Sequence, residues 1–340
     1  MPTIEKLHEA SFYRKIKKDL VKCELCPRFC IIKNNDRGNC CVRKNIDGKL
    51  YSLVYAKPCS VALDPIEKKP FYHFLPGKGT LSIATAGCNL HCLYCQNWTI
   101  SQQKPENVPS VNLPPEKVIE EAKKAESRII SYTYTEPTIF YEYMYDTAKL
   151  AKKERMKNTI VSNGFTNQKP LKNIIPLIDA ANIDLKGDAE FYKKITSSFI
   201  EPVLESLKTY KKKKVWLEIT NLIIPTLNDS PRQIKWLASW IKENLGKNVP
   251  LHFSAFWPTY KLTNLPRTSM ESLKRARIIA MSEGLNYVYT GNVEDEEGST
   301  TFCPRCKEAV IKRHGFYAYE INIRNGKCKF CKAKIAGVWK

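Results

Sequence analysis

Thirteen cysteines carry the clearest chemical signal in this sequence of 340 residues. The central set, Cys88-Asn-Leu-His-Cys92-Leu-Tyr-Cys95, follows directly after an apolar run. Three thiolates this close can ligate three irons of a [4Fe–4S] cluster and leave the fourth iron open to a small molecule. A structural zinc loop completed by a distant ligand such as His91 is the alternative, although structural zinc favours paired C-x2-C knuckles. We therefore predict an iron–sulfur site at Cys88, Cys92 and Cys95.

A second set of cysteines lies near the end of the sequence. Cys303-Pro-Arg-Cys306 and Cys328-Lys-Phe-Cys331 are two C-x2-C knuckles, the arrangement of a zinc ribbon. Four thiolates close the coordination shell of Zn²⁺, so the metal is expected to be structural and to shape a lid or a docking surface. Disulfides are the alternative, and they are disfavoured in a cytoplasmic protein.

The third set lies near the N-terminus and has the spacing C-x2-C-x3-C-x9-C. Its members are Cys23, Cys26, Cys30 and Cys40. Four thiolates suit structural zinc and equally an auxiliary iron–sulfur cluster, with zinc slightly preferred. Four buried free thiols remain a further alternative. Cys41 and Cys59 are expected to be small buried hydrophobic residues.

Apolar runs and amphipathic stretches alternate through the middle of the chain. Expected strands are 80–86, 128–134, 159–162, 181–185, 215–224, 251–256 and 287–289, and expected helices are 115–125, 137–154, 171–179, 201–210, 231–244 and 269–284. This order predicts βαβ units and a parallel sheet. The fold class is therefore α/β, a partial (β/α)6-type TIM-like barrel whose chemistry lies at the carboxyl ends of the strands. An open doubly wound sheet is the alternative.

The central cysteine segment, with an aromatic residue before its last cysteine, closely resembles the signature of radical S-adenosylmethionine (SAM) enzymes. The whole chain resembles the AmmeMemoRadiSam-system radical SAM proteins, relatives of the pyruvate formate-lyase (glycyl-radical) activating enzymes. The segments that carry this resemblance are Cys23–Cys30, Asp47–Tyr55, Asp64–Gly77, Cys95–Trp98, His252–Ser254, Tyr287–Val293 and Gly337–Trp339. The resemblance implies that SAM binds the open iron and is cleaved to methionine and a 5′-deoxyadenosyl radical, which takes hydrogen from a substrate.

The resemblance also implies residues of the SAM pocket. Glu136, after the second core strand, is expected to bind the SAM ammonium, or alternatively to cap the following helix. Ser162 and Asn163, after the third strand, are expected near the ribose. Asp184 and Lys186, after the fourth strand, match an Asp-x-Lys that in activases contacts the methionine half of SAM.

One position departs from the activases. Tyr260 aligns with the histidine that helps those enzymes to hold SAM. This difference weakens the inference that the protein shares the substrate chemistry of the activases more than it weakens the inference that it binds SAM.

Composition and charge limit the possible substrates and the possible location of the protein. The net charge is +21, and residues 301–340 alone carry 10 basic and 2 acidic groups. High positive charge favours non-specific phosphate contact, so an RNA-modifying radical SAM enzyme is the alternative function. The segment Met1–Asp19 has no apolar core of a secretory signal, and no membrane span is expected.

We therefore expect a cytoplasmic, activating-enzyme-like oxidoreductase with three regions. These are a Cys-rich region (1–72), a radical SAM core (73–293), and a linker with a zinc ribbon (294–340), the acidic run Glu294–Glu297 beginning the linker. Expected cofactors are a [4Fe–4S] cluster, SAM and Zn²⁺. Expected partners are a one-electron donor such as a flavodoxin or ferredoxin and a substrate that is a protein glycine or a small molecule.

Overall fold

A computed structural model describes residues 7–340. The first six residues of the expected Cys-rich region therefore lie outside the described part. Among the described residues, no helix combines the length and apolar character needed to cross a bilayer.

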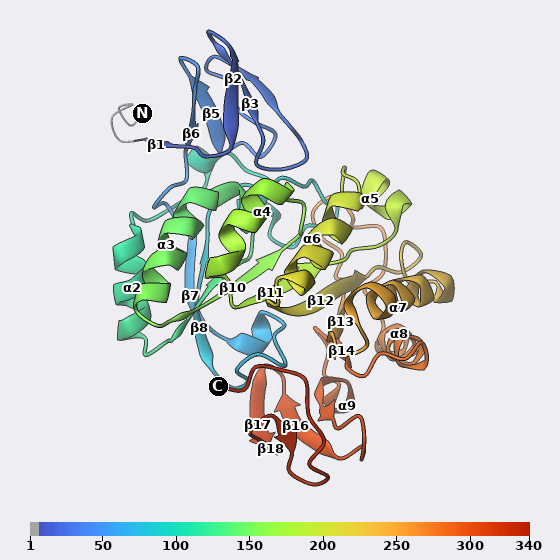
Figure 1. The fold of residues 1–340 in the computed structure, drawn as a ribbon. Helices are drawn as coiled ribbons and strands as arrows, with labels where there is room; N and C mark the ends of the chain where they lie inside the picture. The colour runs from blue at the N-terminus through green and yellow to red at the C-terminus, as the bar shows by residue number, and fades with distance from the viewer. Residues whose placement is uncertain (1–6) are drawn as a thin grey trace.

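An eight-stranded sheet forms the centre of the molecule (Figure 1). Its order is β14-β13-β12-β11-β10-β9-β8-β7, and only β7 is antiparallel to its neighbour. The strands are β7 (Ser60–Pro65), β8 (Gly79–Ala84), β9 (Ile129–Tyr132), β10 (Lys157–Ser162), β11 (Ala180–Asp184), β12 (Trp216–Ile223), β13 (Leu251–Ala255) and β14 (Val288–Gly291). All seven predicted core strands are present and parallel. The strand order leaves β7 and β14 as edges, and a barrel-like curvature stays a prediction.

Helices connect the parallel strands, as expected of βαβ units. They are α1 (Trp98–Ser101), α2 (Pro115–Lys124), α3 (Tyr141–Lys153), α4 (Gln168–Ile174), α5 (Ala189–Ile195), α6 (Glu201–Lys212), α7 (Pro231–Leu245) and α8 (Met270–Ser282), with short 3-10 turns η2 (Ile66–Lys68), η3 (Pro105–Asn107), η4 (Pro137–Phe140) and η5 (Ile175–Leu177). Side chains begin several of them: Asp188, Ser230 and Ser269 each accept a hydrogen bond from a backbone N–H in the first turn. The sequence did not predict α5.

The N-terminal cysteines lie in and between the strands of two small antiparallel sheets at one end of the molecule, with Cys23 at the end of β3 and the others in loops (Figure 1). One has the order β1 (His8–Glu9), β6 (Lys49–Ser52), β5 (Arg43–Ile46), and the other β2 (Tyr13–Lys17), β3 (Leu20–Cys23), β4 (Ile31–Lys33). Val21, Ile32 and Leu50 belong to the same apolar cluster as Ile83 and Ile130 of the central sheet. The Cys-rich region therefore packs on the core rather than standing apart. Strand β7, inside the expected range 1–72, is part of the central sheet.

The C-terminal strands lie at the opposite end of the molecule (Figure 1). They are β15 (Thr301–Phe302), β16 (Ala309–His314), β17 (Tyr317–Ile321), β18 (Ile323–Arg324) and β19 (Lys327–Cys328). Val338 exchanges backbone hydrogen bonds with His73 and Leu75, and the Arg313 guanidinium donates to the Tyr72 carbonyl at 2.7 Å. These contacts lie at the amino ends of the parallel strands. The tail therefore does not form a lid over their carboxyl ends, and that part of the expectation is wrong.

The expected acidic linker also differs from the structure. Residues Glu296–Ser299 form a short helix, α9, that packs against β14 and β16. Asp295 accepts a hydrogen bond from Thr290 Oγ1 at 2.9 Å, and Gly298 and Ser299 are buried. Because this segment is buried and hydrogen-bonded to β14, it joins the tail firmly to the sheet.

Candidate active site

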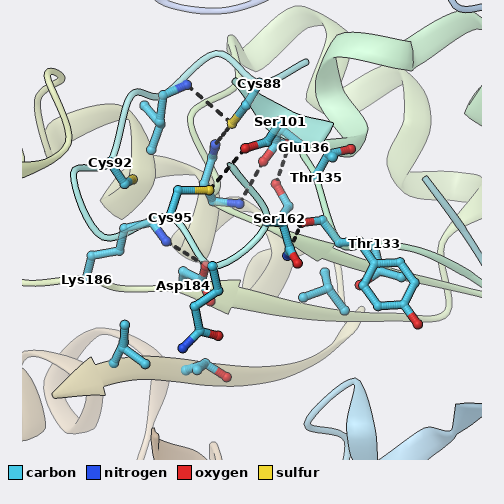
Figure 2. Close-up of a pocket in the computed structure, with 18 of the residues that line it drawn as sticks. Cys88, Cys92, Cys95, Ser101, Thr133, Thr135, Glu136, Ser162, Asp184 and Lys186 are labelled. Atoms are coloured by element: carbon cyan, nitrogen blue, oxygen red, sulfur yellow. Dashed lines mark hydrogen bonds and ion pairs between the residues drawn. The ribbon is translucent and has the colours of Figure 1, made fainter. Parts of the chain in front are cut away.

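The carboxyl ends of β8 to β11 surround a cavity of about 310 Å³ (Figure 2). Every residue that the sequence analysis assigned to the central site lines it. These residues are Cys88, Cys92, Cys95, Glu136, Ser162, Asn163, Asp184 and Lys186. Parallel strands ending at one edge of a sheet explain why positions so far apart in sequence meet here.

The cysteine loop begins at Gly87, immediately after β8. This glycine has φ +95°, and a Cβ on it would lie 2.6 Å from both the Cys40 carbonyl oxygen and Val42 Cγ1. The chain can therefore turn toward the cavity only where a side chain is missing. The turn also presses the loop against the Cys-rich region.

The three central thiols lie together at one end of the cavity (Figure 2). Cys88 Sγ accepts a hydrogen bond from Leu90 N at 3.4 Å, and Cys95 Sγ lies 3.0 Å from Ser101 Oγ. Burial raises the pKa of Cys92 to about 11 and that of Cys88 well above its usual value, the latter with help from Glu136. Buried thiols that resist ionisation become thiolates when a metal binds them. This set of soft donors fits three corners of an iron–sulfur cluster.

His91 does not complete a zinc site with these cysteines. Its Nδ1 lies 2.8 Å from Gln102 Oε1 and its Nε2 lies 2.7 Å from Asn39 Oδ1. Since both ring nitrogens already have hydrogen-bond partners, the alternative of a zinc loop loses its nearest fourth ligand.

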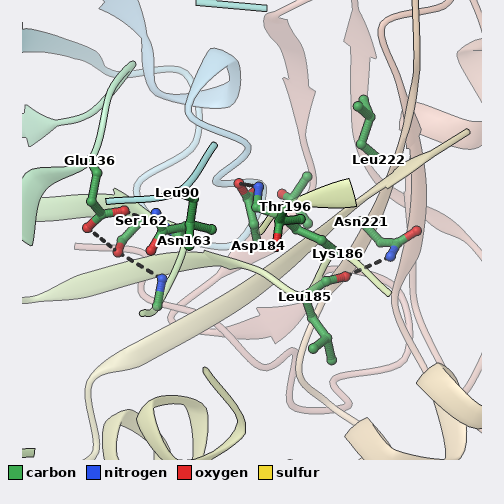
Figure 3. A network of polar contacts seen from close by, with 12 residues as sticks. Leu90, Glu136, Ser162, Asn163, Asp184, Leu185, Lys186, Thr196, Asn221 and Leu222 are labelled. Atoms are coloured by element: carbon green, nitrogen blue, oxygen red, sulfur yellow. Dashed lines mark hydrogen bonds and ion pairs between the residues drawn. The ribbon is translucent and has the colours of Figure 1, made fainter. Parts of the chain in front are cut away.

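Glu136 combines burial with a full set of donors. Its carboxylate accepts hydrogen bonds from Thr138 N at 2.9 Å, Ser162 Oγ at 2.8 Å and Asn163 N at 2.8 Å (Figure 3). Burial raises its pKa, and these hydrogen bonds act in the opposite direction. Glu136 thus caps η4, which is the alternative role expected from the sequence. Its hydrogen bonds also connect the end of β9 to the end of β10. Binding of the SAM ammonium stays a prediction.

Asp184 and Lys186 form an ion pair of 2.7 Å at the end of β11 (Figure 3). Burial alone would lower the pKa of Lys186, but Asp184, Tyr94 and Cys92 raise it well above its usual value. Lys186 is therefore a permanent cation between the cysteine loop and a half-buried carboxylate. The Asp184 side chain is 32% exposed, so it can still meet a ligand.

Asn163 links β10 to the cysteine loop. Its Nδ2 lies 3.7 Å from Cys88 Sγ and donates to Asn89 Oδ1 at 2.9 Å. An amide donor next to a cluster ligand is a common way to tune the reactivity of the sulfur. The side-chain nitrogen of Asn163 therefore faces the thiol and the cysteine loop, while the expected ribose contact stays a prediction.

Sequence reasoning assigned no role to two lysines that line the cavity. Lys68 and Lys69 both pair with Asp64 at 2.8 Å, and Lys69 Nζ lies 3.8 Å from the centre of the Tyr134 ring. Burial lowers the pKa of Lys69 to about 8 despite the carboxylate. The segment Asp64–Gly77 did contribute to the family resemblance, but nothing in it showed that the lysines turn into the cavity.

Tyr260, the departure from the activases, does not line the cavity. Its ring stacks on Trp98 at a centroid distance of 5.4 Å, and Lys261 N donates to Leu93 O at 3.0 Å. Tyr260 therefore supports the loop that carries the cysteines from outside.

The tail cysteines form a compact metal-binding group. The sulfur atoms of Cys303, Cys306, Cys328 and Cys331 all lie within 4.8 Å of one another, with 3.6 Å from Cys303 to Cys331 and 3.8 Å from Cys306 to Cys328. All four are free thiols, so the disulfide alternative is wrong. A tetrahedron with Zn–S bonds of about 2.3 Å has sulfur atoms about 3.8 Å apart, which these distances match.

Comparisons with known proteins show which sequences and folds this chain resembles. A model of the radical SAM superfamily matches residues 82–235. The chain is 48% identical over 331 residues to uncharacterized protein MJ0808 of Methanocaldococcus jannaschii, covering 97% of this chain and 99% of that protein. A radical SAM methyltransferase from Sphaerobacter thermophilus is similar in fold, with TM-score 0.51 and 14% identity over 84% of this chain and 78% of its own.

A second solved structure, SuiB of Streptococcus suis bound to S-adenosylmethionine, has the same TM-score of 0.51 and 14% identity over 67% of this chain and 53% of its own. At such identity the two structures support the fold alone. The family model identifies residues 82–235 as a radical SAM superfamily domain, and the extended sequence identity shows that this chain belongs to one family with MJ0808.

Proposed function

We propose that this protein is an activating-enzyme-like radical SAM enzyme of the AmmeMemoRadiSam-system type. The observation that carries the proposal is the single cavity in which three soft thiol ligands face the Asp184–Lys186 pair and the buried Glu136 carboxylate. A [4Fe–4S] cluster held by Cys88, Cys92 and Cys95 would deliver one electron to SAM and so generate a 5′-deoxyadenosyl radical that takes hydrogen from the substrate.

The protein residues supply position and charge around that chemistry. Asp184 offers a carboxylate to the ammonium of the methionine half of SAM, and Lys186 holds that carboxylate in place. Glu136 fixes the backbone of Asn163, which contacts Cys88. Walls formed by Thr133, Thr135, Val161 and Leu222 restrict water around the reacting atoms.

The substrate belongs to one of two classes, a glycine residue of a partner protein or a small molecule. Lys68 and Lys69 give the cavity wall away from the cysteines a positive character, although Asp64 offsets it. We also propose a cytoplasmic, reducing setting, consistent with thirteen free thiols, and a flavodoxin or ferredoxin as electron donor.

Anaerobic incubation of the reconstituted protein with SAM and dithionite tests the function. The expected result is equal release of 5′-deoxyadenosine and methionine. A protein with its cluster intact that releases neither would overturn the proposal.

RNA modification is the second candidate, and one observation favours it. The tail exposes Tyr317 (70%) and Tyr319 (57%) on β17 among many basic residues, a surface on which bases can stack. However, the tail and the cavity lie at opposite ends of the parallel strands, so an RNA would have to wrap around the molecule. Adding RNA to the same assay distinguishes the two candidate functions. Release of 5′-deoxyadenosine that depends on RNA would select RNA modification.

A further inference from the structure

The fold brings the four N-terminal cysteines near one another. Cys23 ends β3 and Cys30 precedes β4, and Cys23 N donates to Cys30 O at 2.9 Å, so the antiparallel strands hold the two side by side. Asn39 N donates to Cys30 Sγ at 3.4 Å, which brings the loop of Cys40 against them. Cys26 and Cys40 interact electrostatically with Cys23 and with each other. These thiols therefore form a group and not four separate buried side chains.

The spacing of this group differs from that of the tail. Among residues 7–340, only the tail cysteines draw three or more sulfur atoms within 4.8 Å of one another. The N-terminal group and the central triplet are both wider, although the members of each interact electrostatically. One zinc ion requires the tight arrangement, whereas the corners of a four-iron cluster hold their ligands further apart. Neither the N-terminal group nor the central triplet therefore has the tight spacing of the tail zinc group.

A buried cation beside the group lacks partners for part of its side chain. Arg43 is 1% exposed, and its Nη2 donates to Glu142 at 2.6 Å and to the Ser11 carbonyl at 2.7 Å. Its Nε and Nη1 have no hydrogen-bond partner among residues 7–340, while the guanidinium interacts with Cys23, Cys26 and Cys40. Buried donors left unpaired are costly, so they indicate an acceptor that the protein atoms do not provide. Sulfide and thiolate sulfurs of an anionic cluster are such acceptors.

The group lies next to the catalytic cysteines. The Asn89 side chain lies near the Cys26 thiol, whose pKa burial raises and Asn89 helps to lower, and accepts a hydrogen bond from Asn163, which contacts Cys88 Sγ. The Cys40 carbonyl lies against Gly87, and Asn39 contacts His91. Two side chains, Asn89 and Asn163, therefore lie between the two sets of thiols, and Cys30 and Cys40 are partly exposed.

We propose that Cys23, Cys26, Cys30 and Cys40 hold a second [4Fe–4S] cluster, with Arg43 as its buried counter-charge, which exchanges single electrons with the catalytic cluster. The exchange of electrons with the catalytic cluster rests on the proposed function. The assignment of a [4Fe–4S] cluster to these four cysteines does not. A reduced flavodoxin or ferredoxin loses one electron to the second cluster, and this cluster is oxidised again when it passes that electron on. With four protein ligands it has no open iron, so it binds neither SAM nor substrate.

Metal analysis of the full chain tests the assignment. After anaerobic reconstitution with iron and sulfide, the native protein should hold about eight irons per chain and the C88A/C92A/C95A variant about four. Both should retain about one zinc per chain in the tail. A C88A/C92A/C95A variant that holds two zinc ions and no iron would overturn the proposal, whether or not the native protein cleaves SAM.

Loss of the second cluster requires a matched pair of variants. C26S/C30S should lose about four irons, and C41S, which changes the neighbour of Cys40, should lose none. Because C26S/C30S removes two structural ligands, its folding is checked by circular dichroism. If C26S/C30S does not fold, the iron content of the C88A/C92A/C95A variant tests the assignment alone. Equal iron content in C26S/C30S and C41S would contradict the assignment.

Electron paramagnetic resonance tests the proximity of the two clusters. Two reduced clusters this close should broaden or split each other's signals, and each variant that keeps one cluster should give a simple spectrum. A native spectrum equal to the sum of the two single-cluster spectra would contradict electron exchange between them.

Discussion

Asp184 and Lys186 show how a residue pair can serve a ligand without holding the metal. The pair lies beside Cys92 and Tyr94, but neither residue is one of the proposed ligands of the metal cluster. Removing the carboxylate leaves Lys186, whose side chain is 12% exposed, without its nearest anion. An unpaired buried cation would then repel the positively charged ammonium of SAM.

We predict that Asp184→Ala weakens SAM binding about tenfold or more, equivalent to about 1.4 kcal/mol. The iron content should not change, because no thiol is touched. Equilibrium binding of SAM to the anaerobic protein measures the effect. Glu190→Ala is the control, since it also removes a carboxylate paired with a lysine but on an exposed helix outside the cavity. Equal affinity in the two variants would exclude Asp184 from the SAM pocket.

At the scale of elements, the turn between β8 and the cysteine loop depends on one glycine. Gly87 and Gly246 have nearly equal φ angles, +95° and +93°, but a Cβ at Gly246 meets nothing within 4 Å. Alanine at either position carries a backbone cost of about 1 kcal/mol. Only at Gly87 does it also collide with the backbone of the Cys-rich region.

Gly87→Ala should therefore lower the free energy of unfolding by about 2–4 kcal/mol and reduce iron incorporation, whereas Gly246→Ala should cost about 1 kcal/mol. Denaturant unfolding with iron analysis measures both. If the two substitutions cost the same, the contact between Gly87 and Cys40 does not constrain the loop.

The tail is an element that is too small to fold on its own apolar core. Its buried cluster joins Cys303, Val310 and Cys328 to Tyr287 and Tyr289 of the core. A metal bound by four thiolates would therefore supply much of its folding free energy. Replacing Cys328 and Cys331 with Ser should release about one zinc per chain and unfold the tail, while the iron content stays unchanged. Zinc and iron analysis with limited proteolysis checks this; loss of iron with retention of zinc would contradict the assignment of the cysteines.

At the scale of the whole molecule, the sequence predicted the parallel sheet and the residues around the cavity, because both follow from local patterns. Apolar runs mark the strands, and polar residues directly after them meet at one edge. It did not predict β7 or the inward turn of Lys69, since β7 is an edge strand that leaves Val61 and Leu63 exposed, and a buried ion pair has no periodic signal. The sequence also led to a wrong prediction for residues 294–300. The acidic residues there predicted a linker, but the segment packs against the sheet and forms α9.

The position of the tail likewise depends on contacts distant in sequence. Arg313 lies 3.7 Å from Glu67 and donates to Tyr72, and neither pairing has a pattern that a single sequence reveals. These contacts place the tail at the amino ends of the strands, opposite the cavity. The molecule thus has its chemistry at one end of the sheet and a metal-stabilised tail at the other.

Reductive SAM cleavage by the C88A/C92A/C95A variant, measured beside the native protein, decides whether the three central cysteines hold the catalytic cluster. Cys59→Ser is the control, because Cys59 belongs to neither the cavity lining nor the tail metal group. The account predicts that the native protein and Cys59→Ser release 5′-deoxyadenosine and that the triple variant releases none while remaining folded. Release of 5′-deoxyadenosine by the folded triple variant would contradict the assignment of Cys88, Cys92 and Cys95.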